Sequence, residues 1–170
     1  MPREGLNCNL SIPYPRVTQT KLNLYDSRMI RILLSRKLSQ ISEYLLRSAT
    51  LSCEHLHLSE MLECIALCEI KHFKLLASLL CASGESISIS SLAKKGSGRA
   101  YMSGEYGSDT TVEGVISDML ESERASVSDL RLVLSQISDE LARKVLLRIL
   151  ADEEHHADVF ANLITRYKNI

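Results

Sequence analysis

Near the C-terminal end of the chain, Glu153 and His156 have types and a spacing that could bind a metal ion. Residues three apart on a helix project from the same face. The other positions on that face, reached by steps of three and four, are apolar: Ala142, Leu146, Ile149, Phe160 and Leu163. A carboxylate and an imidazole therefore interrupt a stripe that the pattern predicts to be core.

A second pair of the same form, Glu69 and His72, lies in the first half of the chain. Its face is also apolar and consists of Leu58, Leu62, Ile65, Leu76 and Leu79. An unpaired buried carboxylate costs on the order of several kcal/mol, so two such pairs pointing inward need a common partner. A pair of divalent metal ions is the natural one.

A further acid, Glu123, replaces an apolar residue in a third stripe. That stripe reads Val112, Ile116, Met119, Leu120, Glu123, Val127, Leu130 and Leu134. Glu123 lies 30 residues before Glu153, and an antiparallel hairpin can bring both to one level. The predicted metal ligands are Glu69, His72, Glu123, Glu153 and His156. The alternative is that these acids and histidines are surface pairs on misassigned helix faces.

Four long amphipathic helices are predicted to position these residues. They run from about 23 or 26 to 48, from a cap at Ser59 to 82, from 109 or 110 to 135, and from about 138 to 167. On the first, the apolar stripe is Ile30, Leu33, Leu34, Lys37, Ile41 and Leu45. All three prolines lie in the first fifteen residues, so positions 1–21 are predicted to be an extended lead-in.

Residues 22–170 are then one all-α domain, a four-helix bundle. Gly84 should end the second helix, and the glycine- and serine-rich stretch from about 84 to 109 is too long for a tight turn. We expect it to be a crossover between the second and third helices, which gives an up-down-down-up bundle.

Composition excludes several classes of function. With 20 basic and 21 acidic residues scattered along 170 positions, the chain lacks the basic block of a nucleic-acid binder. No apolar run is long enough for a membrane span or a signal peptide, so a cytoplasmic protein is expected. The five cysteines include no Cys-x-x-Cys pair and are odd in number, which favours free thiols in a reducing compartment.

With Glu69-x-x-His72, Glu123 and Glu153-x-x-His156, residues 22–167 resemble the ferritin-like superfamily, and more narrowly its rubrerythrin-like and manganese-catalase-like bacterial members. The Pro13-Tyr14-Pro15 opening and the run 152–156 resemble ferritin-like proteins of Gram-positive bacteria. The resemblance implies two metal ions, one held by a first-helix glutamate and His72, the other by Glu123 and His156. Glu69 and Glu153 would bridge them.

The chain departs from that pattern on its first helix, where Lys37 stands at the position of the glutamate. Four carboxylates offset two divalent cations, whereas three carboxylates and an ammonium leave a charge that matches one. Lys37 is therefore predicted to take the place of the first ion and to stay charged among the acids. The alternative is that Lys37 extends along its helix to solvent.

Three functions remain open at this point. The first is an iron- or manganese-dependent oxidoreductase acting on peroxide or oxygen, and the second is a non-catalytic structural or interaction bundle with one metal ion or none. The third is iron storage. Asp152 could orient a ligand imidazole through its second nitrogen, or could be an exposed helical acid. A homodimer or other homo-oligomer is compatible with each of the three functions.

Overall fold

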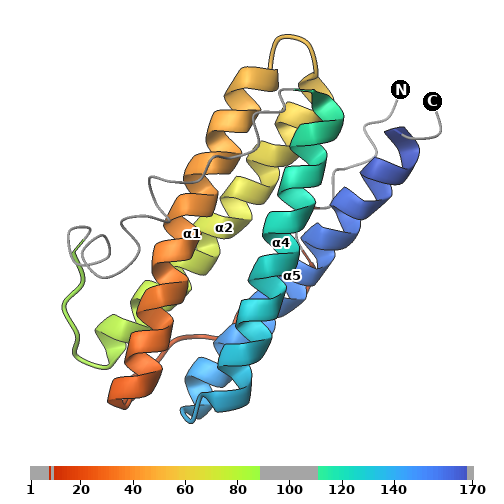
Figure 1. Ribbon diagram of the computed structural model, residues 1–170. Coiled ribbons are helices and arrows are strands. Elements are labelled where there is room, and N and C mark those ends of the chain that lie inside the picture. The colour runs from red at the N-terminus through yellow and green to blue at the C-terminus, as the bar shows by residue number, and fades with distance from the viewer. Residues whose placement is uncertain (1–7, 9, 89–110, 168–170) are drawn as a thin grey trace.

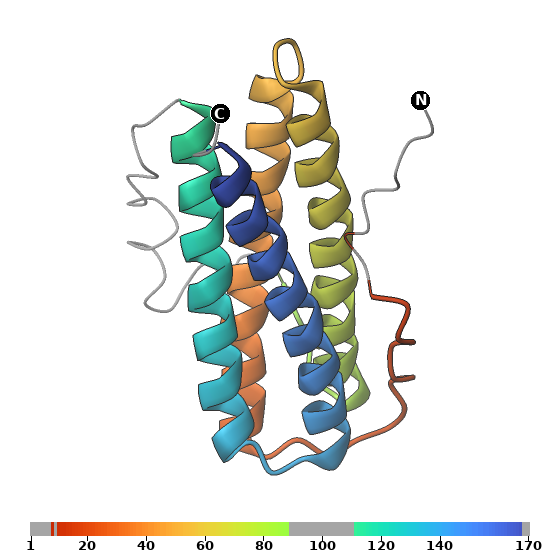
Figure 2. The same cartoon turned by 90° about the vertical axis from the view of Figure 1, so that its right-hand side faces the viewer.

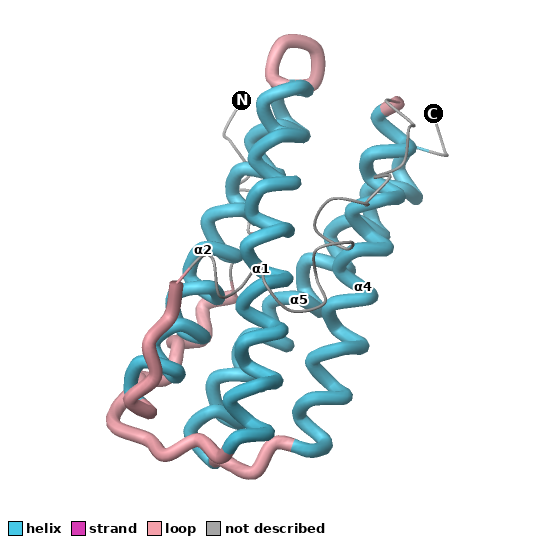
Figure 3. The backbone as a smooth tube through the Cα atoms, turned by 60° about the vertical axis from the view of Figure 1, so that its left-hand side comes forward, coloured by secondary structure: helices cyan, strands magenta, loops and turns pink. Residues whose placement is uncertain are grey.

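A computed structural model describes residue 8 and residues 10–88 and 111–167 of the chain. Its four helices are α1 (Leu24–Leu51), α2 (Leu56–Ala82), α4 (Val112–Gln136) and α5 (Glu140–Tyr167) (Figure 1). Over the described residues every regular element is a helix, and loops or turns join them (Figure 3). The predicted all-α four-helix bundle is thus confirmed, with helix bounds close to those expected.

The ends of the helices follow from local chemistry. Asn23 caps α1 by accepting a hydrogen bond from the backbone N–H of Asp26 at 2.8 Å. Asp139 does the same for α5, accepting from the N–H of Ala142 at 2.7 Å. Gly84 ends the run after α2 with a φ of +84°, a conformation that costs glycine little.

The predicted cap of the second helix is wrong. Residue His55 is the N-cap of α2, and Ser59 lies inside the first turns, where it is buried. Its hydroxyl lies 3.0 Å from the hydroxyl of Ser48 on α1. Ser59 therefore ties two helices together instead of starting one.

The helices form two antiparallel hairpins, α1 with α2 and α4 with α5 (Figures 1 and 2). Followed along the chain in Figure 1, α1 rises, α2 and α4 descend, and α5 rises. The segment between α2 and α4 was predicted to be a crossover over about 84–109. Positions 89–110 of it lie outside the described residues.

The core consists of two apolar clusters with a polar layer between them. One cluster includes Ile30, Leu34, Leu76, Leu130 and Leu146, and the other includes Tyr44, Leu62, Ile65, Ile116 and Phe160. On each helix, the residues between the two clusters along the sequence include buried charged groups: Lys37, Glu69, Glu123 and Glu153. The bundle thus surrounds a polar layer with hydrocarbon at both ends, which lowers the effective dielectric constant there.

The predicted stripes of α2, α4 and α5 are buried almost throughout. On α1 the stripe is right up to Lys37 and then wrong, because Leu45 is 44% exposed whereas Tyr44 is 1% exposed. Two successive steps of four from Lys37 lead to Leu45 and rotate the stripe off the face, since a helix has 3.6 residues per turn. Tyr44, seven residues after Lys37, returns to the same face.

Residues 10–21, part of the predicted lead-in, contain no helix or strand. In Figure 2 this segment runs down beside α2 and then crosses the lower end of the bundle to the start of α1. Among the described residues, no helix combines the length and apolarity needed to cross a bilayer.

Candidate metal centre

All five predicted ligand residues come together in the polar layer. Glu69 and His72 extend from α2, Glu123 from α4, and Glu153 and His156 from α5, and each is 0% exposed. One ligand atom from each of Glu69, Glu123, Glu153 and His156 lies within 4.8 Å of the others. The alternative that these residues are surface pairs is wrong, because all five are fully buried.

Both imidazole rings turn the Nδ1 atom toward the carboxylates. The Nδ1 of His72 lies 3.1 Å from Oε1 of Glu153 and 3.5 Å from Oε1 of Glu69. The Nδ1 of His156 lies 3.6 Å from the same Glu69 oxygen and 3.9 Å from Oε1 of Glu123. The inward nitrogens and the carboxylate oxygens therefore face a common space.

Lys37 lies in the same layer and extends from α1, the one helix that contributes none of the five predicted ligands. Its side chain is 2% exposed, and its Nζ lies 2.8 Å from Oε2 of Glu69 and 2.5 Å from Oε2 of Glu153. The alternative of a lysine extending to solvent is therefore wrong. Burial alone would lower the pKa of Lys37, but the charges of Glu153 and Glu69 raise it above the usual value. The side chain is an ammonium.

The hydroxyl of Ser126 on α4 joins the same group. It donates to Oε2 of Glu153 at 2.5 Å and lies 3.3 Å from the Nζ of Lys37. Glu153 therefore has an ammonium and a hydroxyl on one of its oxygens. The other oxygen, Oε1, faces the imidazoles.

The carboxyl groups differ in protonation. Burial would raise the pKa of Glu69, but the charges of Lys37 and His72 hold it well below the ordinary range, so Glu69 is ionised. Burial, together with the charge of Glu153, raises the pKa of Glu123 well above the ordinary range, so Glu123 carries a proton at neutral pH. Tyr44 donates its hydroxyl to Glu123, and burial raises the pKa of that phenol.

Several inward atoms of the layer have no hydrogen-bond partner among the described residues. They are Oε1 and Oε2 of Glu69, Oε2 of Glu123, Oε1 of Glu153, and Nδ1 of His72 and His156. Some are within ion-pair distance of each other, yet none has hydrogen-bond geometry. Buried polar atoms are normally satisfied, and carboxylate oxygens and imidazole nitrogens that converge in this way could hold a metal ion. This donor set fits a divalent metal ion.

Asp152 lies outside this layer and contacts His72 from behind. Its Oδ2 lies 2.9 Å from Nε2 of His72 and accepts the hydroxyl of Tyr14 at 2.5 Å, and its Oδ1 lies 2.6 Å from Arg148. Asp152 is therefore not an exposed helical acid, because it is buried and bonds to an imidazole. Burial would raise its pKa, but bonds from His72, Arg148 and Tyr14 hold it well below the ordinary range.

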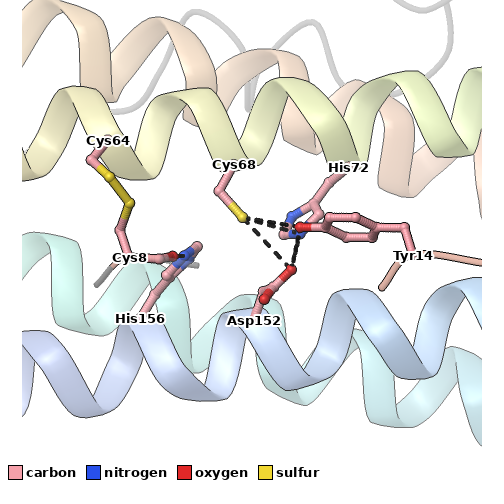
Figure 4. The surroundings of a disulfide bond; sticks show 7 residues. All are labelled: Cys8, Tyr14, Cys64, Cys68, His72, Asp152 and His156. Carbon is pink, nitrogen blue, oxygen red and sulfur yellow. Dashed lines mark hydrogen bonds and ion pairs between the residues drawn. A yellow bond between two sulfur atoms is a disulfide. The ribbon is translucent and has the colours of Figure 1, made fainter. Parts of the chain in front are cut away.

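The lead-in supplies the matching contact to the second imidazole. Nε2 of His156 lies 2.9 Å from the backbone carbonyl oxygen of Cys8, and Cys8 is bonded to Cys64 of α2 through a disulfide (Figure 4). The expectation that all five cysteines are free thiols is wrong for this pair. The two residues are 56 positions apart, and nothing in their spacing indicates that the lead-in returns to α2.

Cys68, one turn after Cys64, is a buried free thiol beside Asp152 and His72 (Figure 4). Its Sγ lies 3.5 Å from Nε2 of His72 and 3.6 Å from Oδ2 of Asp152. Burial would raise the pKa of Cys68, but hydrogen bonds with His156 and His72 lower it to about 7. Nε2 of His72 and Oδ2 of Asp152 also bond to each other. Cys68, His72 and Asp152 therefore form one hydrogen-bonded group on the outer side of the centre.

Several residues that contact the centre, its histidines or Asp152 were not predicted by the sequence analysis, among them Tyr44, Ser126, Arg148 and Cys8. Tyr44 follows Lys37 by seven residues and Arg148 precedes Asp152 by four, so helical spacing could have indicated both. Nothing local distinguishes Ser126 from other serines of α4. The carbonyl of Cys8 is a backbone group whose role depends only on where the lead-in lies.

A scan of models of known protein families and a search of curated proteins found no match to this chain.

Proposed function

We propose that this chain is a ferritin-like metal-binding protein whose centre holds one divalent ion, iron or manganese. The ligands are Glu69, Glu123, Glu153 and His156. In this proposal the ammonium of Lys37 occupies the place of a second ion, and a crossover joins α2 to α4. The parallel course of α2 and α4 supports the crossover, because the chain must return from one end of the bundle to the other.

The convergence of unpaired buried atoms is the observation that carries the proposal. Glu69 Oε1, Glu153 Oε1, Glu123 Oε2 and His156 Nδ1 have no hydrogen-bond partner among the described residues. Oxygen-rich sites with one imidazole suit iron and manganese, whereas structural zinc sites prefer thiolates. Each of these atoms would gain a ligand bond where it now lacks a hydrogen bond.

Lys37 limits the stoichiometry. Its ammonium lies within 2.8 Å of both bridging carboxylates and repels a cation on that side. When a bound ion displaces the proton of Glu123, the three carboxylates and one ammonium carry a net charge of about −2, which one divalent ion neutralises.

Bound iron or manganese would supply Lewis acidity and, for iron, one-electron chemistry. The surrounding residues hold its ligands and the neighbouring His72 in place: the carbonyl of Cys8 fixes the ring of the ligand His156, Tyr44 bonds to the ligand Glu123, and Asp152 fixes the ring of His72. Peroxide or oxygen chemistry that needs two adjacent ions should be weak or absent in this chain.

Metal stoichiometry tests the proposal. Chelated and reconstituted protein should bind at most about one strong ion per chain, with little peroxide consumption. Lys37→Glu restores the charge of a two-metal centre and should raise the content toward two. Lys74→Glu, at an exposed position on α2, is the matched control and should leave the content at about one. Two tightly bound ions in the unmodified protein would refute the role given to Lys37.

A metal-free structural bundle is the second candidate. It is favoured by one observation: Lys37 and His72 already oppose Glu69 and Glu153 inside the layer. Burial would lower the pKa of His72, but Glu69 and the bond to Asp152 raise it, so both imidazole nitrogens can donate. Failure of iron and manganese to bind the unmodified protein, together with binding to Lys37→Glu, would favour this candidate.

A further inference from the structure

Cys8 and residues 10–15, which we call the strap, contact the outer side of the centre, where Cys8 lies beside His156 and Tyr14 beside Asp152 (Figure 4). The strap is held mainly by polar contacts. Arg148 donates from Nε to the carbonyl oxygen of Ile12 at 2.9 Å and from its NH2 group to that of Leu10 at 3.3 Å. The guanidinium also lies 4.3 Å from the centre of the Tyr14 ring. Ile12, by contrast, is 53% exposed, and its side chain adds little apolar packing between the strap and the bundle.

The strap contacts the outer nitrogen of His156 directly and that of His72 through Asp152. The carbonyl of Cys8 lies 2.9 Å from Nε2 of His156, and Tyr14 donates to the Asp152 carboxylate that bonds to Nε2 of His72. A backbone carbonyl can only accept, so it keeps a proton on Nε2 of His156. When the ring is neutral, as a metal ligand must be, its unprotonated nitrogen is then Nδ1, which faces Glu69 and Glu123.

One covalent bond fixes this arrangement. The residue that supplies the carbonyl to His156 is the residue whose sulfur is joined to Cys64 of α2. The carbonyl therefore cannot leave the imidazole without moving the disulfide or turning the backbone of Cys8. The remaining strap contacts are hydrogen bonds and one cation–π contact, each of which is worth roughly a kcal/mol.

We propose that the Cys8–Cys64 disulfide is a redox switch of the centre: reduction releases the strap, frees His156 and weakens metal binding. A dithiol reductant breaks the S–S bond in a two-electron step. Its two thiols become a disulfide, and Cys8 and Cys64 each take up one proton as thiols. In a reducing compartment the pair is held as thiols and the strap is released.

The size of the change follows from the groups that are lost. Removing the partner of a ligand imidazole typically lowers metal affinity about 10–100-fold. The affinity readout rests on the proposed function, whereas opening of the strap does not. Cys68 reports the opening, because its Sγ lies buried 3.4 Å from the hydroxyl of Tyr14.

Thiol counting comes first. Alkylation of the air-oxidised protein in denaturant should label three cysteines, Cys53, Cys68 and Cys81, of the five present. Labelling of all five would overturn the proposal.

The second measurement compares native alkylation of Cys68 with and without dithiothreitol. Reduction should raise its rate at least about tenfold, because a buried thiol reacts from the opened state. The slowly exchanging Nε2 proton of His156 should disappear from the NMR spectrum at the same time. The double variant Cys8→Ser, Cys64→Ser should behave as the reduced protein does, and Cys53→Ser, which removes an exposed thiol, should keep the oxidised behaviour.

The third measurement is manganese affinity in both redox states. Weakening of about 10–100-fold on reduction is expected. If the strap opens but the manganese affinity does not change, the switch is refuted. It is also refuted if reduction changes neither the alkylation rate of Cys68 nor the NMR signal of His156. If the strap opens but manganese binds in neither state, the proposed metal function fails while the redox-controlled strap stands.

Discussion

The two sides of the buried centre are built differently. On the Lys37 side, Oε2 of Glu69 and Oε2 of Glu153 both lie within 2.8 Å of the ammonium, and Ser126 donates to the latter. On the other side of the layer, which we call the open side, the atoms are Oε1 of Glu69, Oε1 of Glu153, Oε2 of Glu123 and Nδ1 of His156, and no hydrogen bond satisfies them among the described residues. Glu69 and Glu153 thus each have one oxygen paired with the ammonium and one oxygen that lacks a hydrogen-bond partner.

This difference shows that a protein side chain, the ammonium of Lys37, can neutralise buried carboxylates on one side of a site and leave the other side unchanged. The ammonium of Lys37 is a compact positive charge at the end of a flexible side chain, and it neutralises charge on Glu69 and Glu153 as a metal ion would. The ammonium cannot be coordinated by Glu123 or His156 as a metal ion could. The atoms of the open side therefore remain without a hydrogen-bond partner among the described residues. Perturbing each side separately therefore has different consequences for stability.

The largest effect is expected from Lys37→Met in chelated protein. Removing one partner of a buried ion pair costs about 3 kcal/mol, because Glu69 and Glu153 lose the charge that opposes them. Urea denaturation monitored by circular dichroism measures the change in the free energy of unfolding. Lys74→Met at an exposed site is the control and should change it by less than about 0.5 kcal/mol. An unchanged midpoint for Lys37→Met would mean that the Lys37 side is not held together by charge.

A smaller effect is expected from Ser126→Ala on the same side. Ser126 contributes one hydroxyl hydrogen bond to Glu153, whose charge is still opposed by Lys37. Loss of the bond should cost about 1–2 kcal/mol in the free energy of unfolding of chelated protein. Ser128→Ala, on an exposed face of α4, serves as the control. A cost as large as that of Lys37→Met would show that hydrogen bonding, and not charge, dominates on this side.

The contrast between the two sides could be predicted in part from the sequence. Glu69, Glu123, Glu153 and their histidines were identifiable because each replaces an apolar residue in a helical stripe, and periodicity alone places such residues inside. Lys37 was found in the same way. Their burial in one layer was therefore predictable, and so were the four helices that bring them together.

The outer contacts could not be predicted, because they depend on tertiary structure. Whether Asp152 is exposed or bonded to an imidazole depends on the placement of α2 beside α5, which one sequence does not specify. The Cys8–Cys64 disulfide depends on the path of the lead-in, and an odd number of cysteines favoured free thiols. The misplaced end of the α1 stripe has a simpler cause, a step rule that ignored the true helical period.

The smallest effect at acidic pH is expected from Glu123→Gln on the open side, in chelated protein. Burial and the charge of Glu153 raise the pKa of Glu123, so the folded protein carries this group protonated, and glutamine resembles that form. Near pH 4, where the unfolded chain also keeps most of this proton, the free energy of unfolding should change by less than about 0.5 kcal/mol. Above about pH 4.5 the unfolded chain loses this proton while the folded chain keeps it, so rising pH favours unfolding of the unmodified protein.

Glu123→Gln removes that penalty and should gain stability relative to the unmodified protein as pH rises, by at most about 1.4 kcal/mol per pH unit. Denaturation at several pH values between 5 and 8 measures the trend, with Glu121→Gln at an exposed site of α4 as the control. The same variant should lose strong manganese binding, since an amide cannot supply the missing charge. A stability difference that stays flat with pH would mean that Glu123 is ionised in the folded protein. The open side would then carry an unopposed charge even without metal, and the contrast with the Lys37 side would be one of charge as well as of hydrogen bonding.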